Sequence, residues 1–279
     1  MAEPLVSTAW LADHLADPGL VVLDATSYLP TERKDARAEF RAAHLPGARF
    51  FDIDEIADPE AALPHTVPTP ARFARLAGAL GAGNDCLVVF YDQKGLVSAS
   101  RGWWMMGLYG HDRAAVLDGG LPRWLAEGRP VVSGDAPPAA PAPFRPDFRA
   151  ARLRGIGDML ANLAAPAELV LDARAAGRFS GALPEPRPGM RSGHIPGAVN
   201  LPYTELLGPE STLLPPAALR ARLARAGVDG SRGVVTTCGS GVSACVLTLA
   251  MVRAGFPAGA VYDGSWSEWG GRPDTPVAT

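Results

Sequence analysis

The chain has 279 residues, of which 47% are hydrophobic and 20% charged, a composition typical of one large or two ordinary globular domains. A net charge of −3 gives no electrostatic reason to expect nucleic acid or an anionic membrane as a partner, and no apolar run is long enough to span a bilayer. The first residues do not read as a signal peptide, and the three cysteines have no zinc-ligand spacing. We therefore expect a cytoplasmic protein with reduced thiols and no metal.

The first half of the chain alternates helical and strand patterns, which predicts an α/β unit with a mainly parallel sheet. Ser7 is the expected N-cap of the first helix. In chain order, we expect a helix over 7–15, a strand over 21–24, a passage from Phe50 to Asp54 into a loop, a helix over 71–80, a strand over 86–91, a turn over 92–95, a helix over 98–108, and a strand over 116–118 followed by a short helix around Trp124.

Residues 133–149 are rich in proline and alanine. No helical or strand pattern fits them, and their composition is typical of a stiff, extended linker. We expect this linker to join an N-terminal domain over 1–132 to a C-terminal domain over 150–279.

The second half repeats landmarks of the first in the same order, which indicates an internal duplication. The strand-end acid Asp24 recurs as Asp172, and His44 recurs as His194. Because both pairs occur in both halves, we expect structural roles for them. The matching landmarks, at offsets of 145 to 150 residues, are Val21–Ala25 with Leu169–Ala173, His44–Ala48 with His194–Ala198, Asp92 with Cys238, and Asp118–Gly120 with Asp263–Ser265.

The stretch from Val234 to Cys245 stands out because an apolar β-branched run leads into Cys238, and a loop with two glycines then leads into a helical pattern. This order predicts a cysteine at the carboxyl end of a strand and next to a helix N-terminus. The exposed N–H groups and the dipole of that helix favour a thiolate, so the pKa of Cys238 is expected to be lowered. Gly239 and Gly241 allow the backbone to curl around the sulfur.

Three interpretations of this loop are to be compared. A lone cysteine is often only a buried structural residue, although two glycines and a following helix exceed what packing requires. A cysteine phosphatase would need an arginine six positions after the nucleophile, where this chain has Ala244. A sulfurtransferase would use the loop N–H groups to stabilise a persulfide on Cys238.

The residues Cys238-Gly-Ser-Gly-Val-Ser243 resemble the active loop of the 3-mercaptopyruvate sulfurtransferases, a tandem-domain branch of the rhodanese superfamily. Ser243 replaces the usual threonine and keeps the hydroxyl. The resemblance covers nearly the whole chain and implies an inactive first domain, in which Asp92 takes the place of the cysteine. It also implies that Cys238 and Ser240 take part in catalysis and that the backbone of Gly239, Gly241, Val242 and Ser243 binds the substrate.

Two arginines lie in a loop-like segment, Gly177-Arg178-Phe179 to Glu185-Pro186-Arg187, which resembles a substrate-binding signature of this family. An arginine fork recognises a carboxylate through two hydrogen bonds, and 3-mercaptopyruvate carries a carboxylate and a keto oxygen. We therefore expect Arg178 and Arg187 to bind the substrate. Arg191 is nearby but is placed outside the site.

The Ser240 hydroxyl is able to relay a proton. The resemblance implies a triad of Cys238, Ser240 and an acid of the first domain, which matches Asp54, and a histidine that matches His65. The segment between these two residues, Ala57 to Ala62, departs from the pattern of the family.

Together these features predict two tandem rhodanese-like domains, each a mainly parallel sheet flanked by helices. The expected activity moves sulfur from 3-mercaptopyruvate through a Cys238 persulfide to thioredoxin, a small thiol or cyanide, releases pyruvate, and uses no cofactor. A thiosulfate sulfurtransferase and a non-catalytic rhodanese-like binding module are the alternatives.

Overall fold

The computed structural model describes residues 3–279 and contains two compact units. The N-terminal unit comprises the described part of Met1–Pro59, Val67–Arg149 and the short segment Gly208–Leu213. The C-terminal unit comprises Glu60–Thr66, Ala150–Leu207 and Leu214–Thr279. Each unit therefore incorporates a short segment from the other half of the chain, which the sequence patterns do not indicate.

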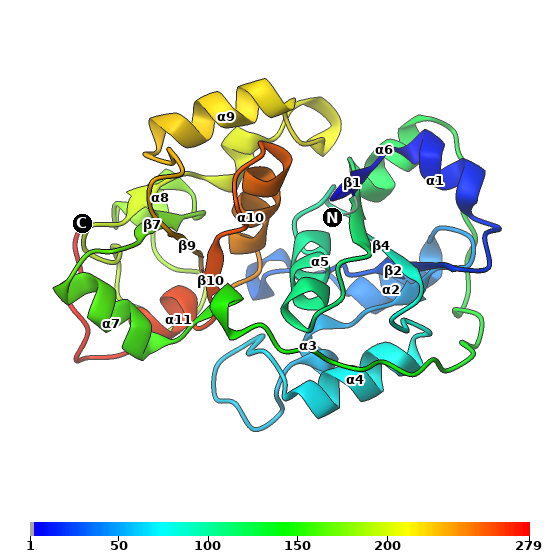
Figure 1. The fold of residues 1–279 in the computed structure, drawn as a ribbon, viewed down its shortest axis with the longest axis horizontal. Coiled ribbons are helices and arrows are strands. Elements are labelled where there is room, and N and C mark those ends of the chain that lie inside the picture. The colour runs from blue at the N-terminus through cyan, green and yellow to red at the C-terminus, as the bar shows by residue number, and fades with distance from the viewer. Residues whose placement is uncertain (1–2) are drawn as a thin grey trace. The chain divides into compact units, whose positions relative to one another are not determined.

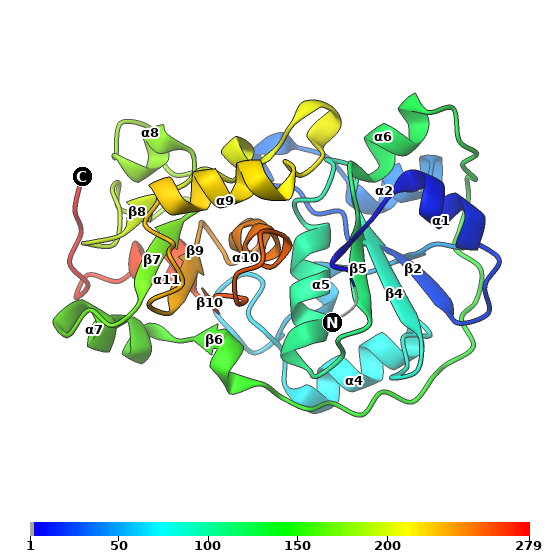
Figure 2. The same ribbon diagram turned by 45° about the horizontal axis from the view of Figure 1, so that its top comes forward.

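The N-terminal unit is a five-stranded parallel sheet in the order β1-β5-β4-β2-β3, with helices on its faces (Figures 1 and 2). Its buried strands are apolar and rich in valine, as expected when helices cover both faces. Its elements are β1 Leu5–Val6, α1 Thr8–His14, β2 Leu20–Asp24, η1 Pro30–Glu32, α2 Ala36–Ala42, β3 Arg49–Phe50, α3 Ile53–Ile56, α4 Pro70–Ala79, β4 Leu87–Tyr91, α5 Ala99–Leu108, β5 Ala114–Leu117 and α6 Gly120–Ala126.

The C-terminal unit repeats this topology with the order β6-β10-β9-β7-β8, again parallel throughout. Every strand of one sheet has a counterpart at the same position of the other, which confirms the predicted tandem fold. Its elements are η2 Ala150–Arg152, β6 Leu153–Arg154, α7 Ile156–Ala164, β7 Leu169–Asp172, α8 Ala176–Phe179, β8 Val199–Asn200, η3 Tyr203–Leu206, α9 Pro216–Arg225, β9 Val234–Thr237, α10 Ala244–Arg253, β10 Ala260–Tyr262 and α11 Ser265–Trp269. The short helix η4 Pro209–Ser211 lies in the segment Gly208–Leu213 of the N-terminal unit.

Local sequence signals account for several features of these elements. The Ser7 hydroxyl accepts a hydrogen bond from the Trp10 N–H and caps α1, as predicted. Helix α5 has glycine at position 102 because the Cα there faces the ring of Phe90, and a Cβ would collide with that ring. The passage from Phe50 to Asp54 leads into a loop, as expected, but only after the one-turn helix α3, which the Asp52 carboxylate begins by accepting the N–H groups of Asp54 and Glu55.

Residues 133–149 contain no helix or strand, but they pack along the N-terminal unit. Phe144 is buried and meets the ring of Phe73 edge-on, and the Asn84 side-chain oxygen accepts the Arg145 N–H. This proline-rich segment is therefore anchored by an aromatic contact and by hydrogen bonds, not merely extended.

The recurring histidines have matching packing roles. The rings of His44 and His194 stack on Phe40 and Phe179, and a ring nitrogen of each lies within hydrogen-bond distance of the carbonyl oxygen of the same phenylalanine. These contacts explain why the two histidines recur in both halves.

Candidate active site

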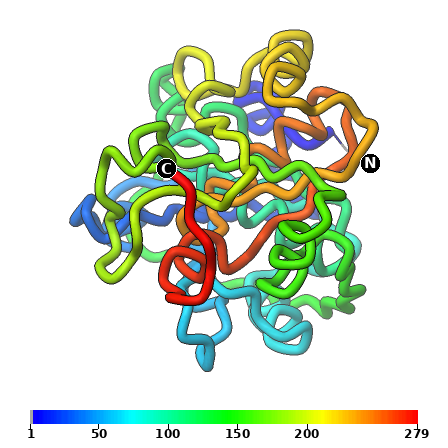
Figure 3. Tube along the Cα trace, turned by 90° about the vertical axis from the view of Figure 1, so that its left-hand side faces the viewer, coloured from blue at the N-terminus to red at the C-terminus, as the bar shows by residue number. Residues whose placement is uncertain are grey.

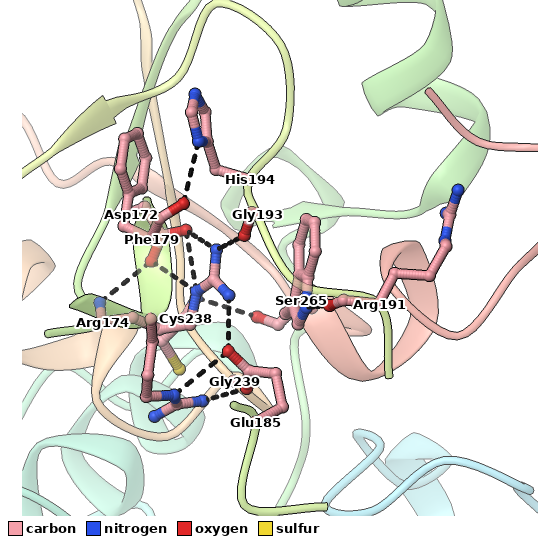
Figure 4. A network of polar contacts seen from close by, with 12 residues as sticks. Asp172, Arg174, Phe179, Glu185, Arg191, Gly193, His194, Cys238, Gly239 and Ser265 are labelled. Carbon is pink, nitrogen blue, oxygen red and sulfur yellow. Dashed lines mark hydrogen bonds and ion pairs between the residues drawn. The ribbon is translucent and has the colours of Figure 1, made fainter. Parts of the chain in front are cut away.

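Cys238 follows β9 and begins the loop 238–243, after which α10 starts at Ala244. The residue is 2% exposed. The first residues of α11 hold its backbone, because the Cys238 N–H donates to the Ser265 hydroxyl at 3.2 Å and its carbonyl accepts the Trp266 N–H at 3.0 Å (Figure 4). The predicted strand, loop and helix are therefore present, with the cysteine at the carboxyl end of a central strand.

The loop after Cys238 leaves several N–H groups available for a ligand. Those of Gly239, Ser240, Val242 and Ser243 have no acceptor among residues 3–279. Gly241 has a φ of 77°, a left-handed conformation that favours glycine. Together with the N-terminus of the ten-residue helix α10, these donors form a site suited to a negatively charged sulfur or oxygen.

Ser240 and His65 are brought together although they are 175 positions apart in the sequence. The His65 Nδ1 lies 3.0 Å from the Ser240 hydroxyl, and both residues are buried. His65 belongs to the segment Glu60–Thr66, which is part of the C-terminal unit, and its φ is 61°. A hydroxyl in contact with an imidazole is a suitable route for a proton.

Arg178 lies on α8, so the expectation of a loop at this position is wrong; the one-turn helix ends just after it. Its guanidinium forms an ion pair with Glu185, through Nε at 3.1 Å and through Nη2. The Nη2 atom also lies 3.0 Å from the position that a Cβ of Gly239 would occupy. Arg178 is therefore held directly against the loop that begins at Cys238.

The other two arginines of this region differ in their surroundings. Arg187 is partly buried in the loop after Glu185. Arg191 donates to the carbonyl groups of Trp269, Gly270 and Thr275, and so fastens the C-terminal segment shown in red in Figure 3. These bonds give Arg191 a packing role and agree with its placement outside the site.

A buried ionic network next to Cys238 was not predicted from the sequence (Figure 4). Arg174, whose side chain is fully buried, donates to both Asp172 oxygens, to Glu185 at 2.8 Å and to the Gly193 carbonyl. Its guanidinium also stacks 4.3 Å from the Trp266 ring. The only sequence signal is an arginine two positions after a strand-end acid, which reveals neither its burial nor its partners.

The electrostatics of this network favour charged forms. Burial opposes the charge of Arg174, but the hydrogen bonds and negative charges of Asp172 and Glu185 more than compensate, so the pKa of Arg174 is raised. Glu185 then accepts from two arginines at once, Arg174 and Arg178. The network thereby connects the end of β7 to the guanidinium beside the cysteine loop.

Asp54 belongs to the N-terminal unit, where it is exposed on α3. Its predicted relation to Ser240 in the other unit stays a prediction. Across residues 3–279, no helix is both long and apolar enough to cross a membrane.

Comparison with known proteins agrees with this geometry. The model of the rhodanese-like domain matches the chain twice, over residues 7–127 and 156–272. The chain belongs to the rhodanese family. It is 44% identical to the human 3-mercaptopyruvate sulfurtransferase, covering 96% of this chain and 92% of the human protein. It is 39% identical to the mitochondrial thiosulfate/3-mercaptopyruvate sulfurtransferase 1 of Arabidopsis thaliana, covering 99% and 78%.

A solved structure supports the same assignment. The crystal structure of SseA from Escherichia coli, described as a 3-mercaptopyruvate sulfotransferase with the rhodanese fold, superposes with a TM-score of 0.86 at 34% identity. The match covers 95% of this chain and 99% of SseA. Both repeats of this chain therefore lie within the similarity to this tandem rhodanese.

Proposed function

We propose that this protein is a 3-mercaptopyruvate sulfurtransferase. The observation that carries the proposal is the loop after the strand-end residue Cys238, in which several N–H groups have no acceptor among the described residues and Arg178 Nη2 lies 3.0 Å from the Cβ position of Gly239. The sequence similarity to sulfurtransferases over nearly the whole chain supports it. A merely structural cysteine would not need unpaired donors around it.

In the first half-reaction the Cys238 thiolate attacks the sulfur of 3-mercaptopyruvate. A sulfur–sulfur bond forms and the carbon–sulfur bond breaks, so that the electron pair of that bond passes to the carbon as the enolate of pyruvate. One proton converts the enolate to pyruvate, and the enzyme retains a Cys238 persulfide. This is covalent catalysis through an activated nucleophile.

In the second half-reaction an acceptor attacks the outer sulfur of the persulfide, and Cys238 leaves as the thiolate. A thiol such as thioredoxin or a small thiol becomes a persulfide, and cyanide becomes thiocyanate. The cycle needs no cofactor as written, and its proposed location is the cytoplasm.

The proposed roles of the site residues follow from their chemistry. Arg178 and Arg187 bind the carboxylate and the keto oxygen of the substrate, and the N–H groups of loop 239–243 stabilise the persulfide. Ser240, with His65 at 3.0 Å, passes the proton needed by the enolate. Asp54 is the proposed acid of this relay. The proposed domain limits are 1–132 and 150–279, with 133–149 as the connection.

The experiment is pyruvate release by the purified protein incubated with 3-mercaptopyruvate and a thiol, compared with thiosulfate as the donor. We expect pyruvate release and, without an acceptor, a mass increase of one sulfur atom on the peptide that contains Cys238. Turnover of thiosulfate alone would favour the alternative donor. Absence of any sulfur transfer would favour a binding module.

A further inference from the structure

Glu185 is a buried carboxylate shared between two arginines. Its side chain is only 4% exposed, and its Oε1 accepts from Arg174 Nη1 at 2.8 Å and from Arg178 Nε at 3.1 Å. Its Oε2 accepts from Arg178 Nη2. Arg174 also forms an ion pair with Asp172 at 2.7 Å. Through Arg174, the position of Glu185 is therefore tied to the end of β7, where Asp172 lies.

The bonds to Glu185 occupy one edge of the Arg178 guanidinium. Nε and Nη2 face Glu185, whereas Nη1 has no acceptor among the described residues. Since Nη2 lies 3.0 Å from the Cβ position of Gly239, Glu185 determines which edge of the fork is directed at a donor next to the loop. A guanidinium without this partner would have several rotamers available.

The ion pair between Glu185 and Arg178 also neutralises the charge of the arginine. Asp172 and Glu185 together carry two negative charges, and Arg174 and Arg178 carry two positive charges, so the cluster is neutral. The loop residues Gly239 and Ser240 add no charge of their own. Without Glu185 the cluster would have a net positive charge directly beside Cys238.

We propose that Glu185 determines the choice of sulfur donor by orienting Arg178 and neutralising its charge, and that it thereby selects donors with one negative charge over donors with two. This inference rests on the proposed sulfurtransferase function. Mercaptopyruvate has one carboxylate charge, whereas thiosulfate is a dianion. In the thiosulfate reaction the Cys238 thiolate takes the outer sulfur, the sulfur–sulfur bond of the donor breaks, and sulfite leaves with the electron pair.

The test is Glu185→Gln, which keeps the shape of the side chain and removes its charge. We measure kcat/KM for mercaptopyruvate and for thiosulfate. The extra charge of thiosulfate then interacts with an uncompensated arginine at an effective dielectric constant of about 20, so the ratio of thiosulfate to mercaptopyruvate kcat/KM should rise about tenfold or more. High salt should reduce this gain only partly, because the site is largely buried.

A matched control is Glu168→Gln. Glu168 forms a two-bond pair with Arg154, at 2.8 Å for each bond, in the same unit. It precedes β7 and therefore lies at the opposite end of the sheet from Cys238. The donor ratio of this variant should equal that of the wild type.

A second variant, Glu185→Asp, retains the charge but shortens the side chain. It should lower kcat/KM for both donors and leave their ratio within about twofold of the wild type. An unchanged ratio in Glu185→Gln, or a ratio in Glu185→Asp that rises as far as expected for Gln, would overturn the role of Glu185. If the wild type releases no pyruvate from mercaptopyruvate, the proposed function itself fails, which is a separate result.

Discussion

The central strands β4 and β9 are followed by equivalent residues, Asp92 and Cys238, but the two loops that begin there differ in what binds their N–H groups. After β4, the Asp92 carboxylate accepts the N–H groups of Lys94 and Ala99, both at 2.8 Å, and the Ser98 hydroxyl at 3.2 Å. After β9, the loop of Cys238 has no internal anion, and several of its N–H groups are unpaired within the described chain. One loop is filled by its own side chain, and the other is available to an external anion.

The acids that end β2 and β7, Asp24 and Asp172, also differ in their hydrogen-bond and ion-pair partners. The Asp24 Oδ1 accepts from the backbone N–H and the hydroxyl of Thr26, and no arginine among the described residues pairs with this carboxylate. Asp172 has the buried Arg174 at the equivalent position. The duplication thus retained the strand-end acid in both units, but only the C-terminal unit couples it to an arginine, to Glu185 and to the cysteine loop.

The largest effect is expected when Cys238 is replaced by serine. A hydroxyl is a poor nucleophile at neutral pH and forms no persulfide, so sulfur transfer should be abolished. The measurement is pyruvate release together with the mass of the Cys238 peptide. Cys86→Ser in the N-terminal unit should retain most activity. Loss of activity in the Cys86 variant would show that the assignment of the nucleophile to Cys238 is wrong.

The second prediction concerns replacement of Arg174 by threonine, the residue that the N-terminal unit has at the equivalent position, Thr26. Arg174→Thr leaves Asp172, whose side chain is 1% exposed, without its arginine, and leaves Glu185, which is 4% exposed, with Arg178 alone. Breaking a buried ion pair in this way costs about 3–5 kcal/mol. We expect this loss in the denaturant-induced unfolding of the C-terminal unit, followed by tryptophan fluorescence.

Arg154→Thr is the control for that substitution. Its pair with Glu168 is about one-fifth exposed, so its loss should cost about 1 kcal/mol or less. Equal losses of stability in Arg174→Thr and Arg154→Thr would contradict a special role for the buried network.

The third prediction concerns the acid pair of the N-terminal unit. Burial raises the pKa of Asp24 from 3.8 to about 6, with a contribution from the negative charge of Asp92. The folded protein therefore binds a proton that the unfolded chain releases. This stabilisation is complete below about pH 4 and is lost as the pH rises through about 6, at a cost of up to about 3 kcal/mol.

Asp24→Asn should flatten this fall in the free energy of unfolding between pH 4 and 7, because the ionisable group is gone. Burial also raises the pKa of Asp92, so a residual slope from Asp92 should remain. Replacement of the exposed Asp17 by asparagine should leave the wild-type slope in place. A slope that is unchanged in Asp24→Asn would show that Asp24 is ionised throughout this range.

The sequence predicted what depends on local pattern. The strand into Cys238, the glycine loop and the repeated acids and histidines are local signals, and the structure has them at the expected positions. The network of Arg174 and Glu185 was not predicted, because a sequence does not show that an arginine is fully buried or which carboxylate it meets eleven positions later. The contact of His65 with Ser240 was implied only by family resemblance, since it depends on a segment of the first half entering the C-terminal unit.

The smallest expected effect lies at the position that follows each strand-end residue. In the N-terminal unit this is Gln93, whose side-chain amide donates to the Ala43 carbonyl at 3.3 Å. In the C-terminal unit it is Gly239, where an added Cβ would lie 3.0 Å from Arg178 Nη2 and 4.0 Å from its Cζ. Because Glu185 braces Arg178, the guanidinium can yield only slightly, and Gly239→Ala should shift it by a few tenths of an ångström.

Such a shift should raise the KM for mercaptopyruvate about three- to tenfold and change kcat little, since the methyl group contacts the substrate-binding arginine and not the sulfur. Gly157→Ala is the matched control, because a Cβ there meets open space on α7. If Gly239→Ala lowered kcat at an unchanged KM, the methyl group would be acting on Cys238 and Arg178 would not be the contact that matters. A KM equal to that of Gly157→Ala would show that Arg178 does not bind the donor in this orientation. The contact with Arg178 would then not explain why the C-terminal unit has glycine at position 239 where the N-terminal unit has Gln93.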